Sequence, residues 1–170
     1  MNCRFVVFFS LLISGCTMVN KEKLSVNIEE VAEDKIGDIH PLLTQLNPKM
    51  SLQELKDNYE QVKDKEYKLH RAVAPNGSSV GLIGYLFNRD LCVGRAMYVD
   101  ILVVDKDYRG KGIAKQLMDF AISKLHQDKN AHCIRWTTRN DLEDAIGFYK
   151  NKIKEPIGYY YRVDNPYFGK

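Results

Sequence analysis

The segment 98–114 carries residues whose types and spacing can bind an anion. Its first part is rich in β-branched and aromatic residues and predicts a strand, and Gly110 and Gly112 follow in a short loop that leads directly into a helical pattern. Because glycine lacks a Cβ, this loop can bring successive backbone N–H groups close to a ligand, and the positive end of the helix adds to them. The loop and first helical turn also carry three cations, Arg109, Lys111 and Lys115. We therefore predict a site for a phosphate or pyrophosphate.

Two common phosphate-binding loops do not fit this segment. The dinucleotide pattern needs a third glycine at the position of Lys115, and the P-loop needs a Gly-Lys-Ser/Thr ending, which is absent here. The other interpretation is a tight strand-to-helix turn that binds nothing, because glycine loops are common. Both interpretations stay open on these residues alone.

Two motifs, taken together, resemble the signatures of the GNAT family of N-acetyltransferases. The run 109–114, Arg-Gly-Lys-Gly-Ile-Ala, resembles the family's Arg/Gln-x-x-Gly-x-Gly/Ala acetyl-CoA signature. The stretch 136–149 resembles its second signature, in which a strand and an asparagine, here Asn140, precede a helix bearing Phe148-Tyr149. The resemblance covers essentially everything after residue 23 and implies an acetyl-CoA-dependent enzyme.

The resemblance also implies a role for individual residues around acetyl-CoA. The implied cofactor contacts are backbone amides of Arg109, Gly110, Lys111, Gly112, Ile113 and Ala114 on the pyrophosphate, a strand edge at Leu102, Val103 and Val104 along the pantetheine arm, and Asn140 as a hydrogen-bonding partner of that arm. Tyr149 matches the family tyrosine that donates a proton to the departing thiolate. Its alternative is a core aromatic, since it shares an apolar helical stripe with Leu142 and Ile146.

A general base is useful for this chemistry, and Asp100 is its candidate. A lysine-like amine has a pKa near 10.4, so removing its proton at pH 7 costs about 4–5 kcal/mol. A carboxylate near the thioester accepts that proton directly or through water. Asp100 is the lone charge in the apolar run 96–104, where many family members carry an acid, usually Glu. The alternative is an aspartate that pairs with Arg139 or another cation.

The elements that must position these residues alternate between strand and helix. Hydrophobic spacing predicts strands over 24–31, 67–74, 79–88, 96–104, 132–138 and 157–163, and helices over 36–46 (with Pro41 inside), 52–62, 112–127 and 141–151. Ser51 and Glu54 have the form of a capping box for the second helix. We expect one α/β domain over 24–170, with the mixed, mostly antiparallel sheet flanked by helices that the family resemblance implies.

The first sixteen residues, MNCRFVVFFSLLISGC, form a separate segment. Arg4 precedes the apolar run 5–13, which is too short for a bilayer span of about 20 helical residues, and small residues follow. The ending resembles a bacterial lipoprotein signal, which implies lipidation of Cys16, removal of residues 1–15 and a tether over 16–23. The alternatives are a buried or frayed apolar N-terminus and a cytoplasmic protein.

Composition narrows the function classes further. The chain has 170 residues and a net charge of +3, too small an excess to indicate nucleic-acid binding. No cysteine or histidine has zinc-type spacing, so we expect no metal, and the four histidines are interpreted as surface or structural residues. Cys92 and Cys133 are either a disulfide or, as we favour, two buried hydrophobes. Two functions follow: acetyl transfer from acetyl-CoA to a primary amine of unknown identity, or a lipid-anchored, non-catalytic binding module.

Overall fold

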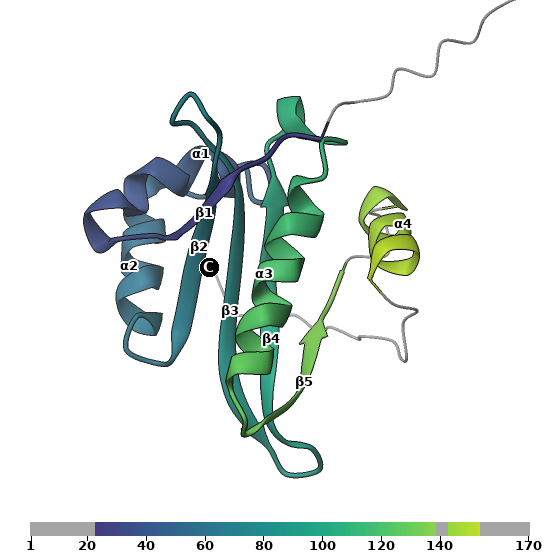
Figure 1. The fold of residues 1–170 in the computed structure, drawn as a ribbon. Coiled ribbons are helices and arrows are strands. Elements are labelled where there is room, and N and C mark those ends of the chain that lie inside the picture. The colour runs from purple at the N-terminus through teal and green to yellow at the C-terminus, as the bar shows by residue number, and fades with distance from the viewer. Residues whose placement is uncertain (1–22, 139–142, 154–170) are drawn as a thin grey trace, which may run out of the picture.

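The computed structural model of the protein describes residues 23–138 and 143–153 (Figure 1). Its elements are β1 (Asn27–Glu30), the 3-10 helix η1 (Glu33–Ile39), α1 (His40–Leu43), α2 (Leu52–Val62), β2 (Tyr67–Val73), β3 (Ser79–Asp90), β4 (Gly94–Val104), the 3-10 helix η2 (Lys106–Tyr108), α3 (Ile113–Gln127), β5 (Ala131–Trp136) and α4 (Glu143–Lys152). The predicted strand over 157–163, Asn140 and the segment 1–16 with Cys16 lie outside the described residues.

The strands form one mixed sheet in the order β1-β2-β3-β4-β5. The first four strands are antiparallel, and β5 runs parallel to β4 because α3 carries the chain back between them. Figure 1 shows α3 lying across one face of this sheet, with α4 near the end of β5. The expected mixed, mostly antiparallel sheet is confirmed.

Each face of the sheet has its own hydrophobic core. On the α3 face, Leu117 and Met118 of α3 are fully buried against Ile83 and Met97 of the sheet. On the opposite face, which we call the α1–α2 face, helical and strand side chains form a second cluster: Ile36, Ile39, Leu42, Leu43, Leu55, Leu69, Leu82 and Val103. Burying a side chain of this kind contributes about 1.5–3 kcal/mol, so both clusters stabilise β4, which lies between them.

Local sequence signals explain several boundaries. The Ser51 hydroxyl accepts from the Glu54 backbone N–H at 3.1 Å and the Glu54 carboxylate accepts from the Ser51 N–H at 2.7 Å, so the predicted capping box starts α2. Pro41 lies in the first turn of α1, where its missing N–H costs nothing, and the 36–46 segment is accordingly divided into η1 and α1.

Some expectations need correction. The first strand begins only at Asn27, and the β3–β4 hairpin turn is shorter than predicted, since its strands reach Asp90 and resume at Gly94. Cys92 lies in that turn and is exposed, so it is not a buried hydrophobe, and no disulfide joins the two described cysteines, Cys92 and Cys133. Among residues 23–138 and 143–153, no helix has the length and apolar character of a membrane span.

Strand β4 changes character at Asp100. Gly84 of β3 pairs with Ile101 and the next residue, Tyr85, pairs with Val99, so Asp100 is the extra residue of a β-bulge. The pairing of β4 with β5 ends at the same place, at Val99 opposite Trp136. Within the described chain, the edge of β4 beyond this point has no strand beside it. Because β5 itself ends at Trp136, this unpaired edge of β4 is the setting of the candidate site.

Candidate active site

The glycine loop has the backbone geometry of an anion site. Gly110 and Gly112 have φ of +79° and +80°, a region that residues with a Cβ rarely adopt. Gly112 is the N-cap of α3 and provides no side-chain cap, and the Gln116 N–H donates to its carbonyl at 3.2 Å. The N–H groups of the three residues between them therefore have no acceptor within the helix. This open, positive helix end has donors available for an anion, and the phosphate site stays a prediction.

The segment before β1 holds this loop in place. The Leu24 N–H donates to the Lys111 carbonyl at 3.1 Å, and the Gln116 side chain donates to the Leu24 carbonyl at 2.7 Å. Arg109 joins the loop to the end of β4, because its Nε donates to the Val104 carbonyl at 3.2 Å. The loop is thus fixed before any ligand arrives, which lowers the entropy cost of binding.

The three cations near the loop are not equivalent. The Lys115 ammonium lies 2.6 Å from Asp119, and this ion pair reduces its net contribution to the local positive charge. The Lys111 ammonium lies 4.6 Å from the centre of the Tyr108 ring, a cation–π contact that keeps it beside the loop. Lys111 is therefore better placed than Lys115 to add charge to an anion site.

Beyond the bulge, β4 is anchored by its side chains and open along one backbone edge. Val103 is buried in the α1–α2 face, whereas Leu102 and Val104 pack against the α3-face core. These contacts hold this part of β4, which has no strand beside it on one edge because β5 ends at Trp136. The backbone polar groups along an unpaired edge can bind an extended ligand as an added strand would.

Asp100 lies at the bulge and is hydrogen-bonded on the α1–α2 side. The Tyr67 hydroxyl donates to Asp100 Oδ1 at 2.8 Å, and Tyr67 packs against the α1–α2-face cluster. Although the residue is exposed as a whole, local burial of its carboxyl raises the pKa of Asp100, and the Tyr67 hydrogen bond opposes that rise. Burial and the adjacent carboxylate together raise the pKa of Tyr67 well above its usual range, so the hydroxyl keeps its proton.

Tyr149 of α4 packs against the α3-face core. Its ring stacks on Trp136 with centroids 5.5 Å apart and contacts the edge of Phe148 at 5.2 Å. Burial raises the pKa of Tyr149 to about 12. Because Trp136 is the last residue of β5 and pairs with Val99, this stack places Tyr149 at the point where the unpaired edge of β4 begins. The aromatic packing expected of a core residue is present, and it positions the hydroxyl without excluding a chemical role.

The sequence analysis missed Tyr67 and Gly84. An ideal Cβ at Gly84 would lie 2.5 Å from the Tyr67 hydroxyl, so only a residue without a side chain allows the hydroxyl to reach Asp100. A glycine inside a strand pattern, here Ile83-Gly84-Tyr85, indicates a bulge or a close approach and was the available signal. Arg139, the alternative partner proposed for Asp100, lies outside the described residues.

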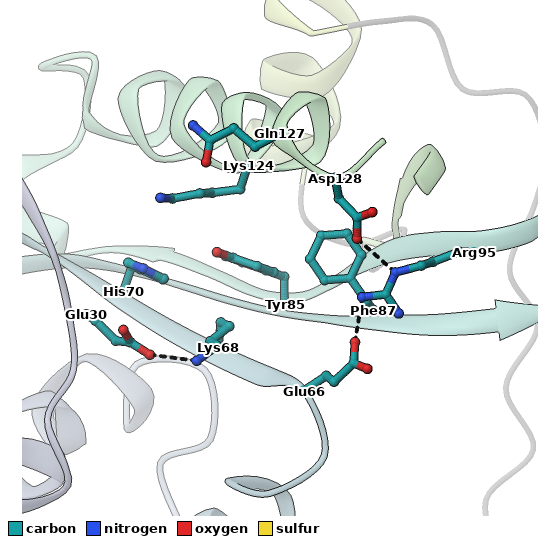
Figure 2. A pocket seen from close by; sticks show the side chains of 10 residues that line it. All are labelled: Glu30, Glu66, Lys68, His70, Tyr85, Phe87, Arg95, Lys124, Gln127 and Asp128. Carbon is teal, nitrogen blue, oxygen red and sulfur yellow. Dashed lines mark hydrogen bonds and ion pairs between the residues drawn. The ribbon is translucent and has the colours of Figure 1, made fainter. Parts of the chain in front are cut away.

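A cavity among the described residues lies elsewhere, at the C-terminal end of α3 (Figure 2). It holds about 450 Å³ and is lined by Glu30, Glu66, Lys68, His70, Tyr85, Phe87, Arg95, Lys124, Gln127 and Asp128. None of the predicted site residues lines it. Arg95 is paired with Glu66 and Asp128 at 2.6 and 2.8 Å, which indicates a structural network. The described residues contain no cluster of three metal-ligand side chains.

Comparison with protein families identifies the class. Residues 37–152 match the model of the Acetyltransferase (GNAT) family, which is more than half of the chain. The chain therefore belongs to the GNAT family, and as an N-acetyltransferase it transfers an acyl group to an amine. No curated protein matches the sequence significantly.

Solved structures confirm the fold. A ribosomal-protein-alanine N-acetyltransferase from Brucella melitensis is 21% identical with a TM-score of 0.70, over 83% of this chain and 99% of the other. An aminoglycoside N-acetyltransferase in complex with CoA is 15% identical with a TM-score of 0.72, over 85% and 97%. An integron cassette protein from V. cholerae is 26% identical with a TM-score of 0.69, over 84% and 94%.

Proposed function

We propose that the protein transfers the acetyl group of acetyl-CoA to a primary amine by direct attack. The observation that carries this proposal is the edge of β4 that is left unpaired where β5 ends, followed along the chain by an uncapped, glycine-rich helix start. At the other end of this edge Asp100 and Tyr149 lie on opposite faces of the sheet. The site thus has a glycine loop for the pyrophosphate, then an open strand edge for the pantetheine arm, and then titratable side chains for the thioester, which is the order of these groups in acetyl-CoA.

The described residues fit the cofactor along its length. Its pyrophosphate would accept from backbone N–H groups of Arg109, Gly110, Lys111, Gly112, Ile113 and Ala114, and its pantetheine arm would pair with the edge formed by Leu102, Val103 and Val104. Asn140 is proposed to hydrogen-bond the arm from the β5 side. The thioester would then lie beside the bulge at Asp100, where β5 ends.

The proposed reaction needs one proton acceptor and one proton donor. The amine nitrogen attacks the thioester carbon, a C–N bond forms and the C–S bond breaks, while Asp100 accepts the amine proton directly or through water. Tyr149 donates its proton to the departing thiolate. Its raised pKa keeps it protonated at neutral pH, as a donor must be. Because Asp100 faces the α1–α2 side, the acceptor would enter from there, across residues 36–66.

A thiol-release assay with acetyl-CoA tests this proposal. Two of the neighbours are named for a ribosomal-protein alanine and for aminoglycosides, so the panel contains peptides with free N-termini and aminoglycosides, together with amino sugars and lysine peptides. We expect amine-dependent thiol release and an acetylated product in the mass spectrum. Absence of any acetyl-CoA binding in calorimetry would overturn the proposal.

The N-terminal sequence favours a second candidate, a lipid-anchored protein that keeps the fold as a non-catalytic binding module. Residues 1–16 resemble a lipoprotein signal, and export would separate the enzyme from acetyl-CoA, a cytoplasmic metabolite. Incorporation of labelled fatty acid that disappears in Cys16→Ser would support the anchor. If the protein is labelled but releases no thiol from acetyl-CoA, the binding module replaces the enzyme as our proposal. If it releases thiol but is not labelled, a cytoplasmic enzyme is favoured.

A further inference from the structure

We propose that Tyr67 is a positioning residue for Asp100, and that Gly84 is the glycine that makes this contact possible. This inference rests on the proposed role of Asp100 as the general base. It assigns a function to two residues that carry no recognisable motif. Tyr67 fixes the carboxylate at the bulge, so that the base is oriented before the amine arrives.

The contact spans two strand spacings. Tyr67 begins β2, Asp100 belongs to β4, and β3 runs between them, which separates the two backbones by about 9–10 Å. The tyrosine side chain crosses β3 at Gly84, and its hydroxyl donates to Asp100 Oδ1 at 2.8 Å. An ideal Cβ at Gly84 would lie 2.5 Å from that hydroxyl and 3.2 Å from Oδ1. Any side chain at this position would therefore displace the donor.

The bulge makes an external donor necessary. As the extra residue, Asp100 has no cross-strand partner in β3, and side chains at bulges are re-aimed relative to a regular strand. A short aspartate at such a position needs a fixed contact to keep one orientation. Tyr67 can provide it because its ring packs against the α1–α2-face cluster, which limits its own rotamers.

In this contact the Tyr67 hydroxyl is always the hydrogen-bond donor and Asp100 the acceptor. Tyr67 keeps its proton throughout the neutral range, so it always donates and never competes with the amine proton for the carboxylate. The groups that act on Asp100 are local burial, which raises its pKa, and three donors that lower it, namely the Tyr67 hydroxyl and the backbone N–H groups of Asp100 and Ile101. No charged side chain of the described residues contributes to this balance. Loss of the hydroxyl should therefore raise the pKa of the base.

The test is the pH dependence of kcat/KM in the full-length enzyme with one acceptor amine. For Tyr67→Phe we expect the acid limb to move up by about one pH unit, kcat to fall about 10-fold and the KM for acetyl-CoA to stay unchanged. Tyr98→Phe is the matched control, because its hydroxyl bonds Thr137 Oγ1 at 3.0 Å from the same strand, two residues before Asp100. We expect no movement of the acid limb in this control.

Gly84→Ala is a second substitution that should break the hydrogen bond between Tyr67 and Asp100. We expect it to reproduce the upward shift of the acid limb, because its methyl group displaces the Tyr67 hydroxyl. In the double variant Tyr67→Phe/Gly84→Ala the shift should be no larger than in either single variant, since both remove one interaction. Thermal unfolding of each variant shows whether the fold is retained.

The outcomes separate this inference from the proposed base. If Asp100→Asn loses activity while Tyr67→Phe leaves the acid limb where it was, the positioning role is wrong and the base assignment stands. If Asp100→Asn keeps wild-type turnover, the base assignment itself is wrong, and the role of Tyr67 falls with it. A shift in Tyr67→Phe and Gly84→Ala that Tyr98→Phe does not show supports the proposal.

Discussion

The two faces of the sheet bury one titratable group each, and only one of these groups receives a hydrogen bond that opposes the effect of burial. On the α1–α2 face, local burial of its carboxyl raises the pKa of Asp100, and the hydrogen bond from Tyr67 limits that rise by stabilising the ionised form. On the α3 face, Tyr149 is held between aromatic rings, and burial raises its pKa to about 12. One face thus maintains a proton acceptor and the other a proton donor.

This difference shows how one unpaired strand edge can have a proton acceptor for the amine on one side and a proton donor for the thiolate on the other. The amine must lose a proton on the side from which it attacks, and the thiolate must gain one as it leaves. Because Asp100 and Tyr149 lie on opposite faces of the sheet, β4 keeps the proton acceptor apart from the proton donor. His70, on the α3 face, follows the same rule as Tyr149, since burial without an ionic partner favours its neutral form.

The largest effect is expected from removing the charge on the α1–α2 face. Asp100→Asn keeps the shape of the side chain but cannot accept a proton, so kcat/KM should fall about 10³-fold in the thiol-release assay. Glu66→Gln, which removes an exposed carboxylate paired with Arg95, should leave kcat/KM within twofold of wild type. An equal loss in both variants would contradict a specific role for Asp100.

The next effect concerns stability and belongs to the α3 face. His70 is 7% exposed, its Nδ1 has no hydrogen-bond partner among the described residues, and burial lowers its pKa from 6.5 to about 4. The unfolded chain therefore binds a proton below pH 6.5 that the folded chain accepts only near pH 4. The contribution of neutral His70 is complete above pH 6.5 and should decline by up to about 3 kcal/mol as the pH falls to 4.

Urea unfolding between pH 4 and 7 measures this loss. His70→Phe keeps an aromatic ring against Tyr85 and Phe120 and should flatten the dependence between pH 4 and 6.5. If the variant and the wild type show the same slope, the acid sensitivity does not come from His70.

A smaller kinetic effect is expected on the donor face. Tyr149→Phe retains the stack on Trp136 but removes the hydroxyl, so kcat should fall about 10²-fold. The dissociation constant for acetyl-CoA in calorimetry should change less than twofold, because the hydroxyl acts only as the thiolate leaves. Equal losses in turnover and affinity would indicate that Tyr149 is a packing residue.

The smallest effect should come from the glycine loop that serves both faces. Gly112→Ala and Gly77→Ala place the same residue at nearly equal φ, +80° and +83°, so each should cost about 1 kcal/mol of stability. Only Gly112 caps α3, and we expect its variant to weaken acetyl-CoA binding about 10-fold while Gly77→Ala binds like wild type. Equal affinities in the two variants would contradict the loop assignment.

The sequence predicted those parts of the site that depend on neighbours along the chain. The glycine loop, the capping box of α2 and the order of strands and helices follow from short-range patterns, and all were predicted. The Tyr67–Asp100 contact joins residues 33 positions apart across an intervening strand, and it depends on a bulge whose register appears only when β3 and β4 pair. The burial of His70 depends likewise on where α3 crosses the sheet. Features that depend on long-range strand register and packing could therefore not be predicted from the sequence.

The most direct test of the central claim is amide hydrogen exchange with and without CoA. We expect slower exchange in residues 101–104 and 109–114, where a ligand would occupy the open strand edge and the uncapped helix start. Residues 96–99 should exchange at the same rate in both states, because β3 and β5 already flank that part of β4. Protection confined to other segments, with exchange in the loop unchanged, would contradict the placement of the cofactor and the reaction built on it.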